Sequence, residues 1–274
     1  MAQFHVYADV AGRRSEPAVR RIGLEDVGAA LREGYDDFAA YPTHAAFLVV
    51  LYPIIGFCLA ALFSGVSAFP LLYPLMSGFA LLGPIAAIVM YEISRRREAG
   101  MTAATGDLLG VLRSPSLPSI LALGALLLVI FVVWIAVAEA IFQATMGSHP
   151  QDSTLGFIRD VLTTRDGWAL IVVGNLVGLA FAAIVLAISA ISFPLMLDRD
   201  VGAASAVQTS WRAVRDNPVP FAVWGVIAAL AIIVGFACLF IGLAVTLPIM
   251  GHATWHLYRR VVVPEQDRNP VGAH

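Results

Sequence analysis

The stretch LPSILALGALLLVIFVVWIAVA, residues 117–138, contains no charged side chain. About 20 consecutive apolar residues cross the hydrocarbon core of a bilayer, so this stretch predicts a transmembrane helix. Three more runs are free of charge, at residues 45–90, 168–197 and 221–251. Of the 274 residues, 59% are hydrophobic and 13% are charged, whereas a soluble domain has about 25% charged residues. The chain is therefore predicted to be an all-α integral membrane protein.

Six transmembrane helices fit into these runs. Residues 45–90 are too long for one helix and suit two, divided by SGVSAFP at residues 64–70. Residues 221–258 can form one very long helix or two shorter ones that turn near GFACLFIG, residues 235–242. An internal repeat favours two, because each unit should contribute a pair of helices. The predicted helices cover residues 45–65, 70–92, 117–142, 168–197 and the two halves of 221–258.

The repeat consists of three stretches that share a helical spacing of apolar residues and end in a proline. They read LEDVGAALREGYDDFAAYP (24–42), REAGMTAATGDLLGVLRSP (97–115) and DRDVGAASAVQTSWRAVRDNP (198–218). Their apolar residues recur in steps of three and four: Leu24, Val27, Leu31, Tyr35 and Phe38; Met101, Ala104, Leu108 and Val111; Val201, Ala204, Val207, Trp211 and Val214. Each proline disfavours helix in the residue before it and suits the first turn of the next helix. We expect three amphipathic helices on the cytoplasmic membrane surface, each followed by a transmembrane pair.

The repeat also predicts the domain organisation. A single six-helix membrane domain is expected over residues 23–262, between cytoplasmic tails at 1–22 and 263–274. Its three units cover about 24–96, 97–197 and 198–260.

The placement of arginine predicts the orientation. All 17 basic residues are arginine, and most lie before the first predicted helix, after the second, after the fourth and after the last. The loop between the third and fourth helices holds only Arg159 and Arg165, together with Asp152, Asp160 and Asp166. Because Arg-rich loops stay in the cytoplasm, an even number of spans with both termini inside fits best. We expect a multi-pass membrane protein with both termini in the cytoplasm, and the net charge of −2 indicates no nucleic-acid partner.

Two polar residues inside predicted spans are candidates for a solute or proton site. Glu139 lies about four residues before the outer end of its helix, and Asn175 about seven residues after the outer start of the next, so the two can meet at similar depth. Ionisable residues within a membrane are costly and suggest function. One interpretation is a proton- or solute-contacting pair, and the other is that Glu139 reaches up to the outer surface.

Other candidates lie nearer the predicted cytoplasmic side. His252 and His256 are one helical turn apart, a spacing that suits a metal or a haem but also a packed membrane interface. The second helix of each unit carries a proline expected to bend it: Pro84, Pro194 and Pro248. Glu92 is close enough to Arg95 or Arg96 to form an ion pair.

The sequence resembles a family of bacterial integral membrane proteins known as domain of unknown function family 2189. The resemblance rests on FPLMLDRDVGAASAVQTSWRAVRDNPVPFAVWG, on LAVTLPIMGHATWHLYRRVV and on RRIGLEDVGAALREGYDDFAAYP, and so extends over about residues 20–263. It implies a fold and a location, and no catalytic residues.

The expected function is that of a non-enzymatic inner-membrane scaffold or accessory subunit, because no nucleophile–base arrangement or phosphate loop is present. The expected partners are the lipid bilayer and other membrane proteins such as respiratory complexes, with no cofactor. Two alternatives stay open. One is a small-solute or proton-coupled transporter that uses Glu139 and Asn175, and the other is a haem- or metal-binding respiratory accessory protein that uses His252 and His256.

Overall fold

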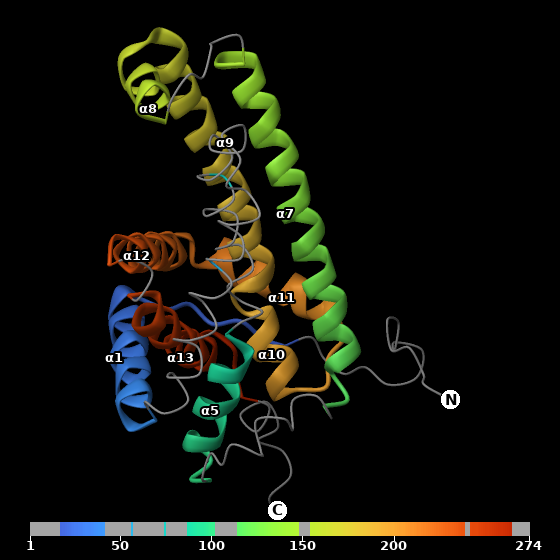
Figure 1. Cartoon of the computed structure of the whole chain (residues 1–274). Helices are drawn as coiled ribbons and strands as arrows, with labels where there is room; N and C mark the ends of the chain where they lie inside the picture. The colour runs from blue at the N-terminus through green and yellow to red at the C-terminus, as the bar shows by residue number, and fades with distance from the viewer. Residues whose placement is uncertain are drawn as a thin grey trace, which may run out of the picture. The chain divides into compact units, whose positions relative to one another are not determined.

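The computed structural model describes residues 17–41, 56, 74, 87–101, 114–147, 154–238 and 242–264, and all the named elements of these residues are helices (Figure 1). The helices are α1 (Leu24–Ala40), α5 (Ile88–Glu98), α7 (Leu117–Thr145), α8 (Thr154–Thr163), α9 (Arg165–Ser189), α10 (Ser192–Asp198), α11 (Ala203–Asp216), α12 (Pro218–Ala237) and α13 (Leu243–Val261). The chain divides into two compact units. One consists of Met1–Tyr52, Gly83–Gly124 and Leu186–His274, and the other of Pro53–Leu82 and Ala125–Val185.

Three helical segments of the described residues are long and apolar enough to cross a membrane. They are α7, the segment Arg165–Asp198 that includes α9 and α10, and α12. The all-helical membrane fold is thus confirmed. The predicted helices at residues 45–65 and 70–92 lie almost entirely outside the described residues. The six-span count and the threefold repeat therefore stay predictions.

The ambiguous run at residues 221–258 forms two helices, as the repeat favoured. α12 ends at Ala237, and α13 begins at Leu243 after the glycine of the predicted turn, Gly242. Gly235 and Gly242 approach closely, because a Cβ on Gly242 would lie 2.9 Å from the Cα of Gly235. A side chain at this point would push the two helices apart. α13 is not among the candidate spans of the described residues.

In the first unit, α13 is the central helix. It packs against α1, α12, α5 and α10, and in Figure 1 it lies beside α1. Large side chains that are almost fully buried fill this unit: Trp255, Tyr258, Phe193, Phe221, Met90, Ile93, Leu195 and Met196. The segment before α1 runs along the end of α13, where the amide of Arg20 donates to the carbonyl of Val261 at 2.9 Å. Burial on this scale holds α13 in the interior of the unit.

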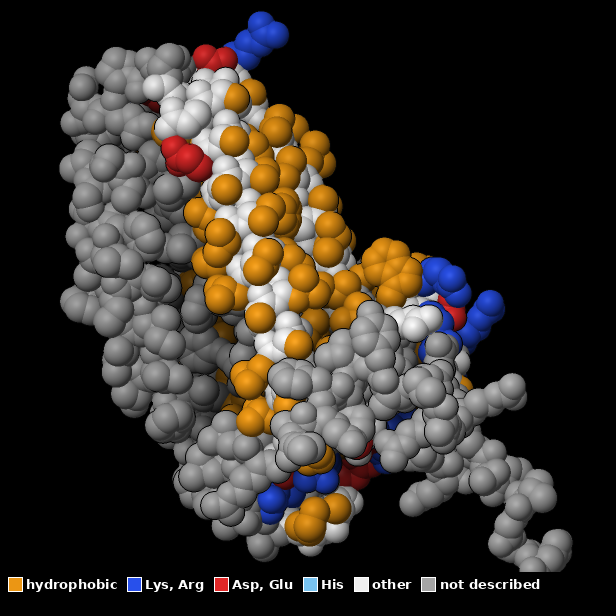
Figure 2. Space-filling model, turned by 90° about the vertical axis from the view of Figure 1, so that its right-hand side faces the viewer, with side chains coloured by type: hydrophobic (Ala, Val, Ile, Leu, Met, Phe, Trp, Pro, Cys, Tyr) orange, Lys and Arg blue, Asp and Glu red, His pale blue; other side chains and the backbone are white. Residues whose placement is uncertain are grey.

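In the second unit, α7 and α9 meet at an aromatic contact, and both helices also expose many apolar side chains. Trp134 lies 5.4 Å from Phe181 between ring centroids, and a Cβ on Gly178 would approach the Trp134 ring to 3.1 Å. Small residues let transmembrane helices approach in this way. Figure 2 shows hydrophobic side chains over the exposed side of α7, among them Leu126, Leu128, Val129, Val132 and Val133. An exposed apolar surface of this kind suits contact with lipid.

The first and third amphipathic stretches form helices, α1 and α11, but the face that each helix buries is offset from its predicted apolar stripe and is richer in small residues. α1 buries Val27, Ala30, Gly34 and Asp37, while Leu24 and Tyr35 are more than half exposed. α11 buries Ala206, Thr209, Ser210 and Ala213, and Trp211 is exposed. Small side chains permit close helix packing, which explains why the bulkier faces point outward. Most of the middle stretch lies outside the described residues.

Candidate functional site

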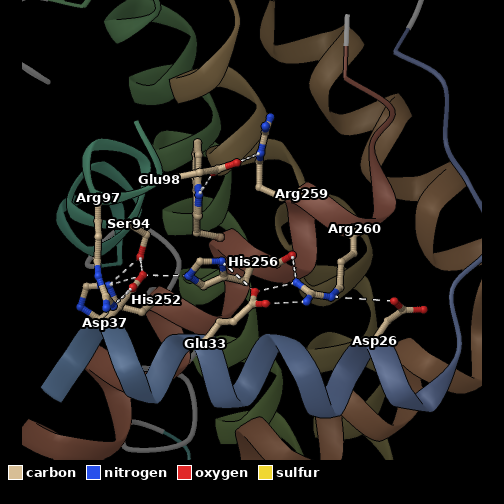
Figure 3. A network of polar contacts seen from close by, with 11 residues as sticks. Asp26, Glu33, Asp37, Ser94, Arg97, Glu98, His252, His256, Arg259 and Arg260 are labelled. Carbon is tan, nitrogen blue, oxygen red and sulfur yellow. Dashed lines mark hydrogen bonds and ion pairs between the residues drawn. The ribbon is translucent and has the colours of Figure 1, made fainter. Parts of the chain in front are cut away.

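Three helices that are distant in the sequence bring their charged side chains together in the first unit. α1 contributes Glu33 and Asp37, α5 contributes Ser94 and Arg97, and α13 contributes His252, His256 and Arg260 (Figure 3). We call these seven residues the polar network. Glu33 and Asp37 are one turn apart, as are His252 and His256, so each helix presents its polar groups on one face.

Asp37 is the centre of the polar network and is 3% exposed. One carboxylate oxygen, Oδ2, accepts hydrogen bonds from the Ser94 hydroxyl and from His256 Nε2, the latter at 2.8 Å. The other oxygen accepts from Arg97. Burial disfavours the charged carboxylate, but the hydrogen bonds from His256, Ser94 and Arg97 outweigh it and hold the pKa of Asp37 below its ordinary value.

Ser94 connects Asp37 to the second histidine. Its Oγ lies 2.8 Å from His252 Nδ1, and that nitrogen is 3.9 Å from Asp37 Oδ2. His252 is 2% exposed. A chain of polar contacts therefore runs from buried His252 through Ser94 and Asp37 to His256.

Arg260 lies at the end of the polar network near Glu33. Its guanidinium donates two hydrogen bonds to Glu33, both 2.7 Å long, in the two-pronged geometry that arginine forms with carboxylates. His256 Nδ1 is 3.1 Å from the same carboxylate. The hydrogen bonds from Arg260 are the main cause that lowers the pKa of Glu33. Asp26 lies 3.8 Å from Arg260 Nε and adds a second negative charge.

A second group of contacts joins the other side of α13 to α5 and α10. Trp255 Nε1 donates to Glu98 at 3.0 Å, and the Tyr258 hydroxyl donates to Asp198 at 2.6 Å. Arg259 lies between these carboxylates, 2.9 Å from Glu98 and 3.5 Å from Asp198. The buried aromatic rings thus have their polar atoms satisfied, as buried Tyr and Trp require.

Close backbone contacts hold the three helices at this distance. A Cβ on Gly34 of α1 would lie 2.5 Å from the backbone nitrogen of Ala253 in α13. A Cβ on Gly251 would lie 2.8 Å from the Cβ of Met90 in α5. Neither position has room for a side chain, so the two glycines set the spacing across which the charged groups meet.

The two predicted metal or haem candidates lie in this polar network. His252 contacts Ser94, and His256 contacts Asp37 and Glu33. Among the described residues, no group of three or more His, Cys, Asp or Glu side chains is arranged to hold a metal ion. The predicted pairing of Glu92 is confirmed, since it contacts Arg95 Nε at 2.8 Å and Arg96 Nε at 2.6 Å.

The predicted intramembrane residues lie in the second unit. Glu139 of α7 accepts a hydrogen bond from Gln143 Nε2 at 2.6 Å. The Asn175 amide of α9 donates to the carbonyl of Ile171 at 2.7 Å. Both hydrogen bonds join residues one turn apart in the same helix. Each polar side chain therefore has at least one hydrogen-bond partner within its own helix.

Two of the three predicted bends lie in the described residues. Helix is interrupted between Ser189 and Ser192, directly before Pro194, where the proline ring crowds the carbonyl four residues earlier. Pro248 lies inside α13, which continues through it. Pro84 lies outside the described residues.

Sequence patterns did not identify Asp37 or Ser94 as site residues. Asp37 follows Val27, Ala30 and Gly34 in steps of three and four, so it lies on a face of small residues. That pattern is a usable signal, because an acid on a close-packing face needs a partner on the helix that packs there. Ser94 has no such signal, since serine is common in helices that cross or border membranes.

One family model matches the chain, and its description is "Predicted integral membrane protein (DUF2189)". The match covers residues 72–198, less than half of the chain, and confirms the resemblance inferred from the sequence over that part. The match is shorter than the expected extent of residues 20–263. It ends at residue 198, near the start of the C-terminal stretch on which the resemblance was based. No curated protein and no solved structure matches the chain.

Proposed function

We propose that this integral membrane protein is a non-enzymatic scaffold or accessory subunit of a membrane complex in the bacterial inner membrane. The observation that supports this most is the polar network, in which the charged groups of three distant segments neutralise one another. Buried charges that are paired and hydrogen-bonded fix one arrangement of helices, because breaking any pair leaves an uncompensated charge. The result is a rigid packing of α1, α5 and α13.

The contacts of Ser94 also favour a structural role over a catalytic one. Serine, histidine and aspartate occur together here, as in hydrolases. In those enzymes the aspartate orients the histidine, and the histidine takes the proton of the serine. Here the Ser94 hydroxyl donates to Asp37 itself, and Ser94 is 1% exposed. A hydroxyl held by a carboxylate and shielded from solvent is a poor nucleophile.

The proposed topology has six spans with both termini in the cytoplasm. Three candidate spans in the described residues and the charge-free run at 45–90 support it. The polar network belongs on the Arg-rich, cytoplasmic side, because ion pairs are costly in hydrocarbon and arginine is retained in the cytoplasm. α1 and α11 then border the cytoplasmic surface of the membrane.

Purification of the full-length chain from native membranes tests the scaffold proposal. We expect one or a few integral membrane proteins in constant ratio to the chain, each of which recovers the chain when it carries the tag instead. Asp37→Asn should release these partners without loss of the chain from the membrane. Its neighbour Asp36, which is exposed, offers the matched control Asp36→Asn, which should retain them.

The transport alternative makes the opposite prediction for Glu139. A scaffold tolerates Glu139→Gln, with its partners and growth phenotype intact. The scaffold proposal fails if the chain purifies without partners and reconstituted liposomes take up a solute that Glu139→Gln abolishes at normal expression.

A further inference from the structure

The short helix α8 stands at the junction of two candidate spans. Only Thr164 separates it from α9, and its Phe157 contacts Phe142 in the last turn of α7, with ring centroids 6.1 Å apart. α8 therefore lies where the apolar stretches of α7 and α9 end and charged residues begin. Arg159, Asp160, Arg165 and Asp166 all occur within this short region.

The corner between α8 and α9 is held tightly. The Thr164 hydroxyl accepts a hydrogen bond from the Gly167 amide at 2.9 Å and so caps the start of α9. The same hydroxyl donates to the carbonyl of Asp160 at 2.7 Å. A Cβ on Gly167 would lie 2.3 Å from the carbonyl oxygen of Val161, so only glycine fits. These contacts fix the direction in which α8 leaves α9.

The apolar side of α8 is only partly covered. Phe157 faces α7, but Leu155, Ile158 and Leu162, in steps of three and four, are 79%, 41% and 56% exposed. Trp168, in the first turn of α9, is 55% exposed and donates its indole N–H to the carbonyl of Leu162 at 3.1 Å. The stripe therefore continues from α8 onto the span itself.

We propose that Leu155, Ile158, Leu162 and Trp168 form a membrane-interface anchor, and that the lipid bilayer is its occupant. The stripe is continuous along α9 with the exposed apolar residues Val172 and Leu176 of a candidate span, which lipid surrounds. Tryptophan concentrates at the boundary between acyl chains and headgroups. Arg159 follows Ile158 directly and is exposed, so in an interfacial helix its long side chain can reach headgroup phosphates.

A helix of this kind fixes the depth of its two neighbouring spans. An amphipathic helix that lies in the interface resists movement of its apolar face into water and of its charges into hydrocarbon. The contacts at Thr164 and Gly167 hold α8 at a fixed angle to α9. A helix α8 that stays in the interface therefore also opposes movement of α9 into or out of the bilayer. The anchor is independent of whether the chain acts as a scaffold.

Lipid contact can be measured on the full-length protein in liposomes of phosphatidylethanolamine and phosphatidylglycerol. Single cysteines are introduced as Ile158→Cys and Leu162→Cys after Cys58 and Cys238 are replaced by alanine, and are labelled with an environment-sensitive fluorophore. Thr163→Cys is the matched control, because Thr163 is exposed and lies on the polar side of α8. We expect blue-shifted emission at positions 158 and 162, and its loss when the lipids carry a quencher high on the acyl chain. Position 163 should show water-like emission and little quenching.

Three results would overturn the anchor. The first is water-like, unquenched emission at all three positions. The second is equal quenching at position 163 and at the two apolar positions, which would mean that α8 is immersed without a preferred face. The third is blue-shifted emission that lipid quenchers leave unchanged, which would assign the stripe to a protein partner, or to a second copy if cysteines at position 158 cross-link between chains.

Discussion

The two units of this chain satisfy their side chains in opposite ways. Around α1, α5 and α13, the interior contains carboxylates, histidines and arginines, and each charge faces another. Around α7 and α9, Glu139 and Asn175 make hydrogen bonds within their own helices, and many of the exposed side chains are apolar. In the proposed topology the difference follows from the surroundings, because lipid accepts an apolar exterior whereas buried charges near water need partners. One unit therefore depends on specific pairs, and the other on helix packing and lipid contact.

The largest effect should come from removing the central acid of the polar network. Asp37→Asn leaves His256 and Arg97 facing a neutral group, and loss of one partner of a buried pair costs about 3–5 kcal/mol. We expect the low end of that range, because Arg97 is partly exposed. Thermal unfolding of the purified chain in detergent measures the change. The matched variant Asp36→Asn, at an exposed position, should change stability by less than about 0.5 kcal/mol.

A smaller effect should come from the contact that sets the distance between α1 and α13. Gly34→Ala places a methyl group 2.5 Å from the Ala253 backbone, and overpacking of this kind costs about 1–3 kcal/mol. Gly28 lies on the same helix with nothing near its Cβ position. Gly28→Ala should therefore stabilise the chain by up to about 1 kcal/mol through helix propensity. Equal behaviour of the two variants would show that α1 does not pack on α13 at this point.

Acid should weaken the polar network by a smaller amount. The pKa values of Asp37 and Glu33 lie below their ordinary values in the folded protein. A depressed pKa contributes stability above the unfolded pKa, and that stability is lost as the pH falls through the folded pKa. The melting temperature should therefore stay level from neutral pH to the ordinary range of acids, at about pH 4, and fall below it. This fall should be shallower in Asp37→Asn, and a wild-type curve equally shallow would contradict the assignment.

The smallest effect is expected on the lipid-facing side of α7. Val132 is 59% exposed, so Val132→Ala exchanges one lipid contact for another and should change stability by less than about 0.5 kcal/mol. Leu127 on the same helix is fully buried. Leu127→Ala opens a cavity and should destabilise the protein measurably. A large loss for Val132→Ala would mean that protein, not lipid, covers this face.

Local patterns predicted a good part of the fold. The charge-free runs correctly placed α7, α9 and α12. The glycine-containing turn near residue 235–242 correctly divided α12 from α13. The pairing of Glu92 with Arg95 and Arg96 followed from helix geometry, because three- and four-residue spacing places them on one face.

The polar network could not be predicted in the same way. His256 and Asp37 are 219 residues apart, and no local spacing indicates that α1 packs on α13. The apolar composition of residues 243–251 suggested a membrane span. It did not indicate that the rest of α13 carries the side chains that pair with α1. The largest apolar side chains of α1 also did not indicate which face of the helix packs on α13, because close packing favours small residues such as Ala30 and Gly34.

The most direct test of the closed polar network is a charge exchange between Glu33 and Arg260, which join α1 to α13 through two hydrogen bonds of 2.7 Å. Each single reversal, Glu33→Arg or Arg260→Glu, places like charges together and should lower the melting temperature of the full-length chain in detergent. Because the pair is partly exposed, each loss should be about 1 kcal/mol. The double variant should recover most of the loss. Losses that simply add in the double variant would contradict the pairing of the two helices.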